Sequence, residues 1–264
     1  MGRVSAVVNQ KGGVGKTTTA VSLAGWLALG GRRVLLIDAD AQGNASSALG
    51  VDRRALEACL YDALVDAQPL TELIRPTGVA GLEIVPATVN LAGAEVDLAQ
   101  RAPDDVPDWR ESRLRAALAP VRDDYDVILI DGPPSLGLLT VNALLAADGV
   151  IIPMPAEYLA LEGLSQLLHT VQIVQRRLNT RLDLDGVVLT MYDPRTRLAQ
   201  QVAAEVQTFF GRRLCRTTIP RNVRLGEAPS FGEPIHQFAP TSPGGRAYQA
   251  LCAELFGGRK EAKR

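Results

Sequence analysis

A glycine-rich segment near the start of the chain constrains the fold more than any other feature. Residues 10–18 read Gln-Lys-Gly-Gly-Val-Gly-Lys-Thr-Thr, between an apolar run at residues 4–8 and an apolar helical pattern at residues 19–29. This order predicts a strand, a loop and the start of a helix. Glycine accepts backbone conformations that other residues avoid, so successive N–H groups of the loop can point at one anion. We therefore predict that the loop binds the phosphates of a nucleotide.

The residues of this loop have separate predicted roles. Lys16 is expected to reach the β and γ phosphates, and Thr17 is expected to offer its hydroxyl to Mg²⁺. The flanking strand and helix patterns favour this interpretation over a flexible glycine turn with solvated lysines. The predicted nucleotide-binding residues of the loop are Lys11, Gly12, Gly13, Val14, Gly15, Lys16, Thr17 and Thr18.

The rest of the chain repeats the alternation of apolar strand and helix. Strands are predicted at residues 4–8, 34–37, 82–85, 126–130, 150–153, 186–190 and 217–219, with helices between them that include residues 156–178 and 244–256. Such alternation predicts an α/β fold with a single doubly wound, mostly parallel sheet flanked by helices. We expect residues 1–257 to form one nucleotide-binding domain and residues 258–264 to form a short basic, disordered tail.

Two helices are expected to pack through regularly spaced apolar residues. The helix at residues 156–178 carries Leu164, Leu167, Leu168, Val171 and Val174 along one side, which indicates core or dimer packing. The helix that follows residue 197 is expected to bury Leu198, Val202, Val206 and Phe209. Residues 101–115 are charge-rich, and we interpret them as a solvated helix face and loop.

Composition excludes several classes of function. The formal net charge is −1, so a nucleic-acid surface must be a local cluster. Cys59, Cys215 and Cys252 lack C-x-x-C spacing, which favours reduced thiols in the cytoplasm over a disulfide framework or zinc site. His169 and His236 are isolated, so neither indicates a metal site. The first strand leaves no room for a signal sequence, and no apolar stretch approaches membrane-spanning length.

Carboxylates follow two of the predicted strands. Asp38 and Asp40 come after the run at residues 34–37, and Asp131 comes after the run at residues 126–130. Open parallel sheets bind ligands at the carboxyl ends of their strands. We take Asp40 as a candidate catalytic and metal-binding residue, and Asp131 as the aspartate that holds Mg²⁺ directly or through water. In the alternative interpretation, each aspartate caps the helix that follows it.

Four segments of the chain resemble one family. The loop carries Lys11 near its start, and the form Lys-Gly-Gly-x-Gly-Lys-Thr resembles the deviant Walker A loop of the MinD/ParA superfamily. Residues 38–44 (Asp-Ala-Asp-Ala-Gln-Gly-Asn), 131–137 (Asp-Gly-Pro-Pro-Ser-Leu-Gly) and 220–230 (Pro-Arg-Asn-Val-Arg-Leu-Gly-Glu-Ala-Pro-Ser) are similar to segments of ParA partition ATPases of the Soj type. The resemblance covers nearly the whole chain, which is identified as a member of this family. The chain departs from the family pattern at Ala41, Gly226 and Glu233, where proline, serine and lysine are common.

The resemblance implies roles for individual residues. Lys11 and Gly12 would lie at a dimer interface, with Lys11 reaching the nucleotide of the partner. Asp40 would position the attacking water, while Lys16 and Lys11 stabilise charge in the transition state. Pro220 and Asn222 would meet the adenine, and Met191 is a further predicted nucleotide contact.

Arginines crowd the C-terminal third of the chain. They are Arg195, Arg197, Arg212, Arg213, Arg216, Arg221 and Arg224. The family resemblance implies that Arg195 and Arg224 contact DNA phosphates, and Arg197 and Arg221 are further candidates. The guanidinium fork suits phosphate, and no aromatic residues alternate with the arginines, so contact should be with the DNA backbone only. Charge alone fits a solvated face equally well, and Glu233 removes one positive charge nearby.

The implied activity is a slow ATPase that uses ATP and Mg²⁺. ATP would drive a homodimer that binds nonspecific double-stranded DNA, and a ParB-type centromere-binding partner would stimulate hydrolysis. Such a protein would be cytoplasmic and associated with the nucleoid. Two alternatives stay open. A MinD-like membrane-cycling ATPase needs a C-terminal amphipathic helix, of which residues 244–264 show no clear basic-amphipathic face. A nucleotide-gated regulator that barely hydrolyses ATP would share the same loop.

Overall fold

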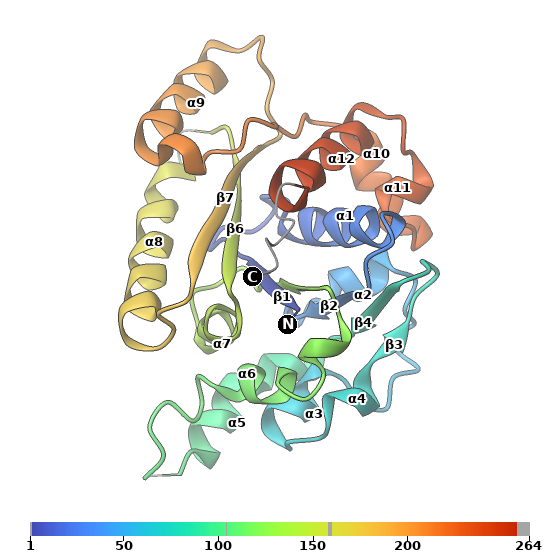
Figure 1. Cartoon of the computed structure of the whole chain (residues 1–264), viewed down its shortest axis with the longest axis vertical. Helices are drawn as coiled ribbons and strands as arrows, with labels where there is room; N and C mark the ends of the chain where they lie inside the picture. The colour runs from blue at the N-terminus through green and yellow to red at the C-terminus, as the bar shows by residue number, and fades with distance from the viewer. Residues whose placement is uncertain (1, 104, 158–159, 258–264) are drawn as a thin grey trace, which may run out of the picture.

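One seven-stranded sheet runs through the molecule (Figure 1). The computed structural model describes residues 2–103, 105–157 and 160–257, with the backbone alone at residues 160–162. The strand order is β3-β4-β2-β5-β1-β6-β7, and all neighbouring pairs are parallel except β3 with β4. The strands are β1 (Arg3–Val7), β2 (Val34–Asp38), β3 (Arg75–Pro76), β4 (Leu82–Val85), β5 (Val127–Asp131), β6 (Gly149–Pro155) and β7 (Asp183–Thr190). The predicted α/β class with a mostly parallel sheet is confirmed.

Helices cover both faces of the sheet (Figure 1). One face carries α1 (Lys16–Leu29), α2 (Asn44–Ala48), α11 (Ile235–Phe238) and α12 (Pro243–Phe256), with α10 (Val223–Glu227) and the 3₁₀ turn η4 (Ala228–Phe231) beside them. The other face carries α3 (Leu60–Val65), α4 (Leu70–Leu73), α5 (Ala94–Arg101), α6 (Arg113–Leu118), α7 (Leu138–Ala146), α8 (Ala160–Arg177) and α9 (Arg197–Phe210). Three further 3₁₀ turns are η1 (Val89–Gly93), η2 (Arg122–Asp124) and η3 (Gly211–Arg213).

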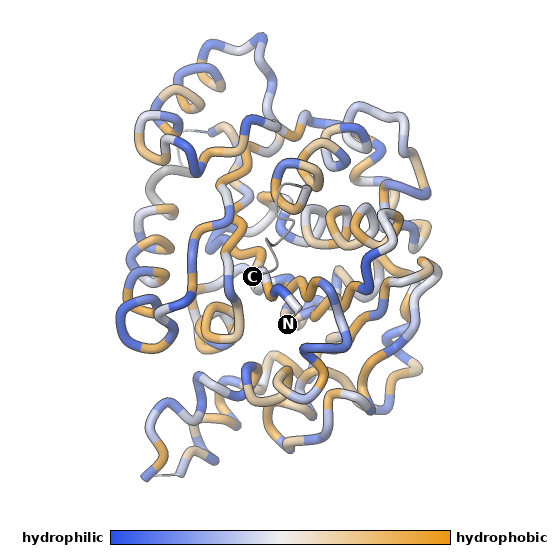
Figure 2. The backbone as a smooth tube through the Cα atoms, in the orientation of Figure 1, coloured by the Kyte–Doolittle hydropathy of each residue, from blue (hydrophilic) through white to orange (hydrophobic). Residues whose placement is uncertain are grey.

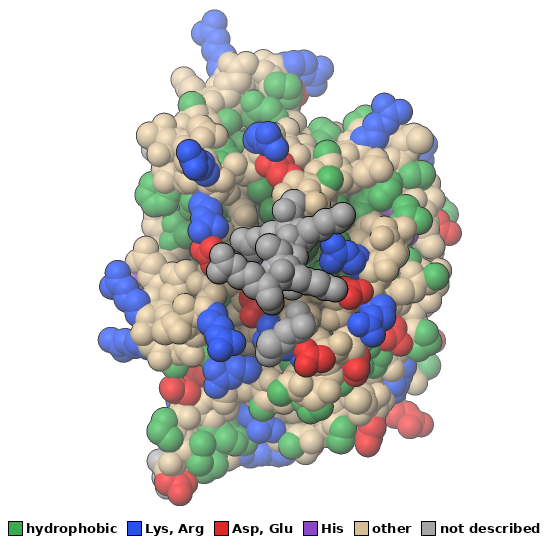
Figure 3. Space-filling view, in the orientation of Figure 1, with side chains coloured by type: hydrophobic (Ala, Val, Ile, Leu, Met, Phe, Trp, Pro, Cys, Tyr) green, Lys and Arg blue, Asp and Glu red, His purple; other side chains and the backbone are tan. Residues whose placement is uncertain are grey.

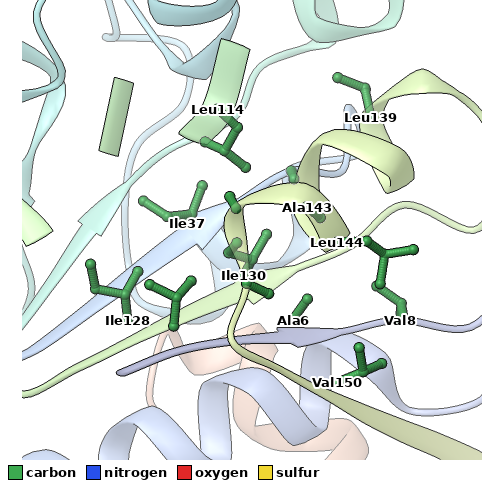
Figure 4. Close-up of a cluster of buried hydrophobic side chains, with 14 of the residues drawn as sticks. Ala6, Val8, Ile37, Leu114, Ile128, Ile130, Leu139, Ala143, Leu144 and Val150 are labelled. Atoms are coloured by element: carbon green, nitrogen blue, oxygen red, sulfur yellow. The ribbon is translucent and has the colours of Figure 1, made fainter. Parts of the chain in front are cut away.

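Alternation of side chains along each strand divides the core into two layers. Ala6 of β1 packs toward α7, whereas its neighbour Val7 packs toward α1. Figure 4 shows the first layer, where Leu139, Ala143 and Leu144 of α7 lie over strands β1, β2, β5 and β6. Both faces are buried, so the central strands are mostly apolar, and Ser5, Asp38 and Asp131 are buried polar exceptions within them. Figure 2 colours each residue of the chain by its hydropathy.

The predicted strand at residues 217–219 is wrong. Within this segment the N–H of Ile219 donates to the carbonyl of Leu189 in β7 at 2.8 Å, and isolated parallel bridges flank the segment, Val187 with Leu214 and Tyr192 with Pro220. The N–H of Thr217 donates to the Glu254 carboxylate at 2.9 Å. Because that donor is taken and Pro220 has none, the segment cannot form a continuous ladder.

The helix packing predictions hold for α8 and fail in part for α9. Leu164, Leu167, Val171 and Val174 of α8 are buried, and Leu168 packs against the same cluster. In α9, Val202 and Val206 are buried, whereas Leu198 is 51% exposed and Phe209 is 72% exposed. Phe209 instead makes an edge contact with Phe210, with ring centroids 4.9 Å apart. The helix therefore buries a narrower stripe than its sequence pattern predicts.

The cysteines and histidines lie apart from one another. Cys59 and Cys215 are buried free thiols, and Cys252 is half-buried. His236 is buried beside Trp26 of α1, with ring centroids 5.9 Å apart. None of the helices within residues 2–103, 105–157 and 160–257 has the length and apolarity needed to cross a bilayer. The predicted tail at residues 258–264 lies outside the described residues.

Candidate nucleotide site

The glycine-rich loop joins the carboxyl end of β1 to the start of α1. Gly13 and Gly15 have φ values of 71° and 92°, a region that side chains other than glycine rarely adopt. Val14 is buried between them, and its carbonyl accepts a hydrogen bond from the Thr190 hydroxyl at 2.8 Å. The loop is thus anchored to the end of β7 from within. Helix α1 begins at Lys16, so its free N–H groups face the loop.

Lys16 reaches back into the loop. Its side chain is buried, and its Nζ donates to the carbonyl oxygen of Lys11 at 3.0 Å. Burial lowers the pKa of Lys16, and the negative charges of Asp131 and Asp40 oppose that shift. A buried ammonium that bridges the loop marks the position where phosphate oxygens are held in P-loop proteins. Thr17 and Thr18 follow in the first turn of α1 and are half-buried.

Asp131, at the end of β5, is fully buried with both carboxylate oxygens lacking a hydrogen-bond partner among the described residues. Burial raises its pKa well above the usual value, and the neighbouring charge of Asp38 adds to the rise. The Thr17 hydroxyl, nearby but outside hydrogen-bond geometry, and the Lys16 ammonium act in the opposite direction. A buried carboxylate without partners is costly unless a cation or donor satisfies it, and this donor set fits Mg²⁺.

The helix-capping alternative does not describe Asp131. Helix α7 begins at Leu138, and the N–H of Leu139 donates to Glu95 of α5 at 3.2 Å rather than to Asp131. Within the described residues there is also no cluster of three or more His, Cys, Asp or Glu side chains able to hold a metal. A cation at Asp131 would therefore take few protein ligands, as Mg²⁺ does.

Asp38 and Asp40 have different surroundings. Asp38 is fully buried and accepts hydrogen bonds from the N–H and hydroxyl of Ser46 at 2.8 and 2.7 Å, which fixes α2 to the end of β2. Burial raises the pKa of Asp38 to about 6, although the bonds from Ser46 lower it. Asp40 accepts one bond, from the N–H of Gln42 at 3.0 Å. It closes a local turn, whereas the N-cap of α2 is Gly43, so the predicted alternative role as a helix cap is not observed.

Strand order brings these residues together. Strands β2, β5 and β1 are neighbours, and Asp131 of β5 pairs with Val7 of β1 on one side and Asp38 of β2 on the other. The glycine-rich loop, Asp40 and Asp131 therefore leave the same edge of the sheet side by side. The structure thus brings together three motifs that the sequence places separately, each after its own strand.

Lys11 is exposed, and its ammonium group contacts an acidic side chain outside the loop. Its Nζ lies 3.3 Å from the Glu157 carboxylate, on the segment after β6, and its N–H donates to the Asn9 side chain at 3.0 Å. Gly12 is also exposed, with only Pro134 near the position of a Cβ, at 3.9 Å. Sequence reasoning did not find Glu157, since nothing in its local pattern links it to the loop.

The three predicted contacts outside the loop gather near the end of β7. Met191 has a φ of 52°, a conformation uncommon for a residue with a side chain and frequent at functional sites. The N–H of Tyr192 donates to the carbonyl of Ile219 at 3.0 Å, which places Pro220 beside the strand end. Asn222 accepts from the N–H of Arg224 at 3.0 Å and so caps α10.

The arginines of the C-terminal third form two groups. Near the end of β7, Arg195 pairs with Asp193 through two bonds of 2.9 and 2.8 Å, and Arg224 pairs with Glu227 at 2.8 Å. Arg197 and Arg221 are exposed nearby in sequence. The second group, Arg212, Arg213 and Arg216, lies toward the start of β7, where Arg213 pairs with Asp183. On the face drawn in Figure 3, basic and acidic side chains are interspersed.

Comparisons with known proteins agree with this site. A family model described as an AAA domain matches residues 2–184. The chain is 52% identical over 255 residues to the sporulation initiation inhibitor protein Soj of Bacillus subtilis, covering 97% of this chain and 98% of that protein. It is 51% identical over 256 residues to the chromosome partitioning protein ParA of Myxococcus xanthus, covering 97% and 88% of the two chains.

Solved structures share the fold. Cobyrinic acid a,c-diamide synthase from Mycobacterium smegmatis with bound ADP and magnesium has 38% identity, a TM-score of 0.82 and 98% coverage of both chains. The septum site-determining protein MinD of Pyrococcus horikoshii, complexed with Mg-ADP, has 25% identity and a TM-score of 0.77, and the match covers 97% of this chain and 96% of that protein. The chain therefore belongs to the ParA/Soj family of chromosome-partitioning ATPases, within the MinD/ParA superfamily.

Proposed function

We propose that residues 1–257 act as one ATPase domain that binds ATP with Mg²⁺ and serves in DNA partitioning. Two buried charged groups carry this proposal. Lys16 lies inside the loop that follows β1, and Asp131, at the end of the adjacent strand β5, has a carboxylate without a hydrogen-bond partner among the described residues. The relative that is named a chromosome partitioning protein, and a neighbour that contains ADP and magnesium, support the proposal.

Nucleotide binding would use groups that are already oriented. Lys16 would exchange the carbonyl of Lys11 for phosphate oxygens, and the N–H groups from Gly12 to Thr18 would surround them. Asp131 and the Thr17 hydroxyl, with Asp40 beside them, would hold Mg²⁺. The cation would neutralise charge on the phosphate oxygens during transfer.

Hydrolysis would depend on Asp40. Its side chain is 7% exposed and accepts one hydrogen bond on Oδ1, from Gln42. We expect the carboxylate to orient the attacking water, while Lys16 stabilises the charge that develops on the phosphate. Because Lys11 is exposed, a second copy facing the loop would bring its own Lys11 to the nucleotide. The family resemblance supports this sandwich dimer.

DNA binding would use Arg195, Arg197, Arg221 and Arg224. The bridge between Tyr192 and Pro220 holds their two segments side by side at the end of β7. Dimer formation would double the number of arginines and so raise affinity for duplex DNA through avidity. A ParB-type partner would then accelerate hydrolysis and release the dimer from the nucleoid, as the family resemblance implies.

Size-exclusion chromatography with ADP and with ATP, each with and without nonspecific duplex DNA, tests the proposal. Lys16→Ala should abolish nucleotide binding, and Asp40→Ala should keep an ATP dimer on DNA with little hydrolysis. Arg224→Ala should spare hydrolysis and weaken DNA binding, most visibly at high salt. A wild-type chain that stays monomeric in ATP and ignores DNA at low salt would contradict the proposal.

Two further measurements separate the alternatives. Pelleting with liposomes and ATP should be negative, and recovery in the lipid pellet would favour a membrane-cycling ATPase. Phosphate release in the presence of DNA and a ParB-type protein should exceed the basal rate. A rate that stays near zero under both conditions would favour a nucleotide-gated regulator.

A further inference from the structure

We infer that Glu95 is a positioning residue for the loop at residues 132–137, which follows Asp131. This inference rests on the proposed ATPase function. Glu95 belongs to α5, in a part of the chain to which the sequence patterns assign no chemistry. It contacts the first turn of α7, and the loop leads directly into that helix.

The start of α7 depends on a side chain from another helix. Its N-cap residue is Gly137, which has no side chain to receive the free N–H groups of the first turn. The carboxylate of Glu95 accepts the N–H of Leu139 at 3.2 Å. A negative charge at this helix end is also favourable to the peptide dipoles. Glu95 therefore supplies the cap that the local sequence lacks.

Gly137 leaves the space that Glu95 occupies. A Cβ at this position would lie 2.3 Å from Oε1 of Glu95 and 2.9 Å from its Oε2. The φ of Gly137 is −81°, so the backbone itself would accept alanine. The requirement for glycine at this position comes from the approach of Glu95.

Helix α5 is a firm support for this contact. Ala94 and Leu98, on either side of Glu95 along the helix, are fully buried. The Tyr61 hydroxyl donates to Asp97 at 2.8 Å and ties the same helix to α3. A carboxylate carried on such a helix fixes the start of α7 relative to the core, rather than moving with the loop.

The loop in turn contacts the glycine-rich loop. The N–H of Gly132 donates to the carbonyl of Val7, at the end of β1, at 3.0 Å, and the Cβ of Pro134 lies 3.9 Å from the position that a Cβ on Gly12 would take. The Thr140 hydroxyl donates to the carbonyl of Ser135 at 2.7 Å and so joins the loop to the first turn of α7. The position of α7 thus sets the position of Pro134 and its neighbours over the phosphate site. Without the Glu95 carboxylate, the C-terminal end of the loop would lose a contact that fixes its position.

Amide hydrogen exchange of the nucleotide-free chain tests this contact without using activity. Glu95→Ala should speed exchange in the peptide that covers residues 132–140, whereas Glu95→Gln should retain slow exchange because its amide oxygen still accepts a hydrogen bond. Gln100→Ala, an exposed change on the same helix, is the matched control. Unchanged exchange in Glu95→Ala would overturn the inference, whether or not the chain hydrolyses ATP.

Steady-state kinetics add the functional readout. Glu95→Ala should lower kcat about tenfold and leave the ADP dissociation constant within about twofold, since the loop affects geometry more than ground-state binding. Glu95→Gln should restore most of kcat. Equal losses of kcat and ADP affinity, with a lowered melting temperature, would show a general structural role and overturn the inference.

A double substitution tests the pair directly. Gly137→Ala should speed exchange at residues 132–140 as Glu95→Ala does, because the new Cβ displaces the carboxylate. Gly137→Ala combined with Glu95→Ala should be no worse than either single change. Effects that add fully would show that the two residues act independently, against the inference. If the wild-type chain has no ATPase activity, the proposed function fails, while exchange still decides the role of Glu95.

Discussion

The ammonium group of Lys11 lies 3.3 Å from a carboxylate oxygen of Glu157. The two side chains are 43% and 50% exposed, so water screens the pair and its net stabilisation is small, about 1 kcal/mol or less. Lys11 can therefore leave Glu157 for a phosphate at little cost. Lys16, by contrast, is buried and faces its own loop.

From this difference we predict that Lys11→Ala retains nucleotide binding but loses dimer formation. The ADP affinity of the variant should stay within about twofold of wild type, because the side chain makes no contact inside its own loop. Its ATP-dependent dimer should be lost in sedimentation velocity runs. Lys16→Ala is the control that should lose both properties, and an ATP dimer formed by Lys11→Ala would refute the role.

Neutralising the acidic partners of two arginines should strengthen DNA binding. Asp193 and Glu227 occupy guanidinium donors that phosphates would otherwise take. Asp193→Asn and Glu227→Gln should each raise the affinity of the ATP-bound chain for duplex DNA roughly two- to fivefold. The Arg195 guanidinium lowers the pKa of Asp193 to about 2, so this residue should add no step to DNA affinity between pH 5 and 8. Fluorescence anisotropy with labelled duplex DNA, over a salt series and over this pH range, measures the affinity and its pH dependence. Weaker DNA binding by either variant would count against the assigned surface.

His236 should make an unfavourable contribution to stability in mild acid. Burial lowers the pKa of His236, and its Nδ1 has no hydrogen-bond partner among the residues described. The unfolded chain takes up a proton near pH 6.5 before the folded chain does, so the contribution of His236 to the free energy of unfolding should decrease as pH falls from 7 to 5.5. The raised pKa values of Asp38 and Asp131 act in the opposite direction over the same range, so the test is the difference between variants. In urea titrations, His236→Gln should lose less stability than wild type between pH 7 and 5.5. His169→Gln, at an exposed histidine, is the control, and equal slopes for the two variants would contradict the assignment.

A buried hydrogen bond between α1 and α12 should be measurable. The hydroxyls of Thr19 and Tyr248 lie 3.0 Å apart, and both residues are buried. Tyr248→Phe should lower the free energy of unfolding by about 1–2 kcal/mol, because the Thr19 hydroxyl loses its partner. A double-mutant cycle with Thr19→Val should return a coupling of about 1 kcal/mol. A coupling near zero would show that the hydroxyls do not interact.

Local pattern was sufficient to predict the central sheet. The apolar runs at residues 4–8, 34–37 and 126–130 became β1, β2 and β5, each with ends shifted by no more than one residue. Parallel strands buried on both faces consist mainly of apolar residues, which makes them easy to find. Since phosphate loops and acidic ligands follow such strands directly, the main site residues could be placed with them.

Contacts between distant segments could not be predicted in the same way. The segment at residues 217–219 has an apolar, β-branched pattern, but the Glu254 carboxylate occupies backbone N–H groups that a strand would need. Glu95 and Glu157 read as ordinary surface acids, and only the fold places them against α7 and Lys11. The two-residue strand β3 is too short to leave a pattern at all.

The position of β5 between β1 and β2 has a consequence for synthesis on the ribosome. The phosphate loop, which follows β1, and Asp40, which follows β2, have both been synthesised by residue 50. Strand β5, which lies between β1 and β2 in the sheet, is synthesised only with residues Val127–Asp131. A nascent chain that ends before this strand lacks both the central pairing and Asp131. ATP can therefore stabilise the folded state only after half of the polypeptide has emerged. A chain that terminates before this point would lack part of the proposed nucleotide site.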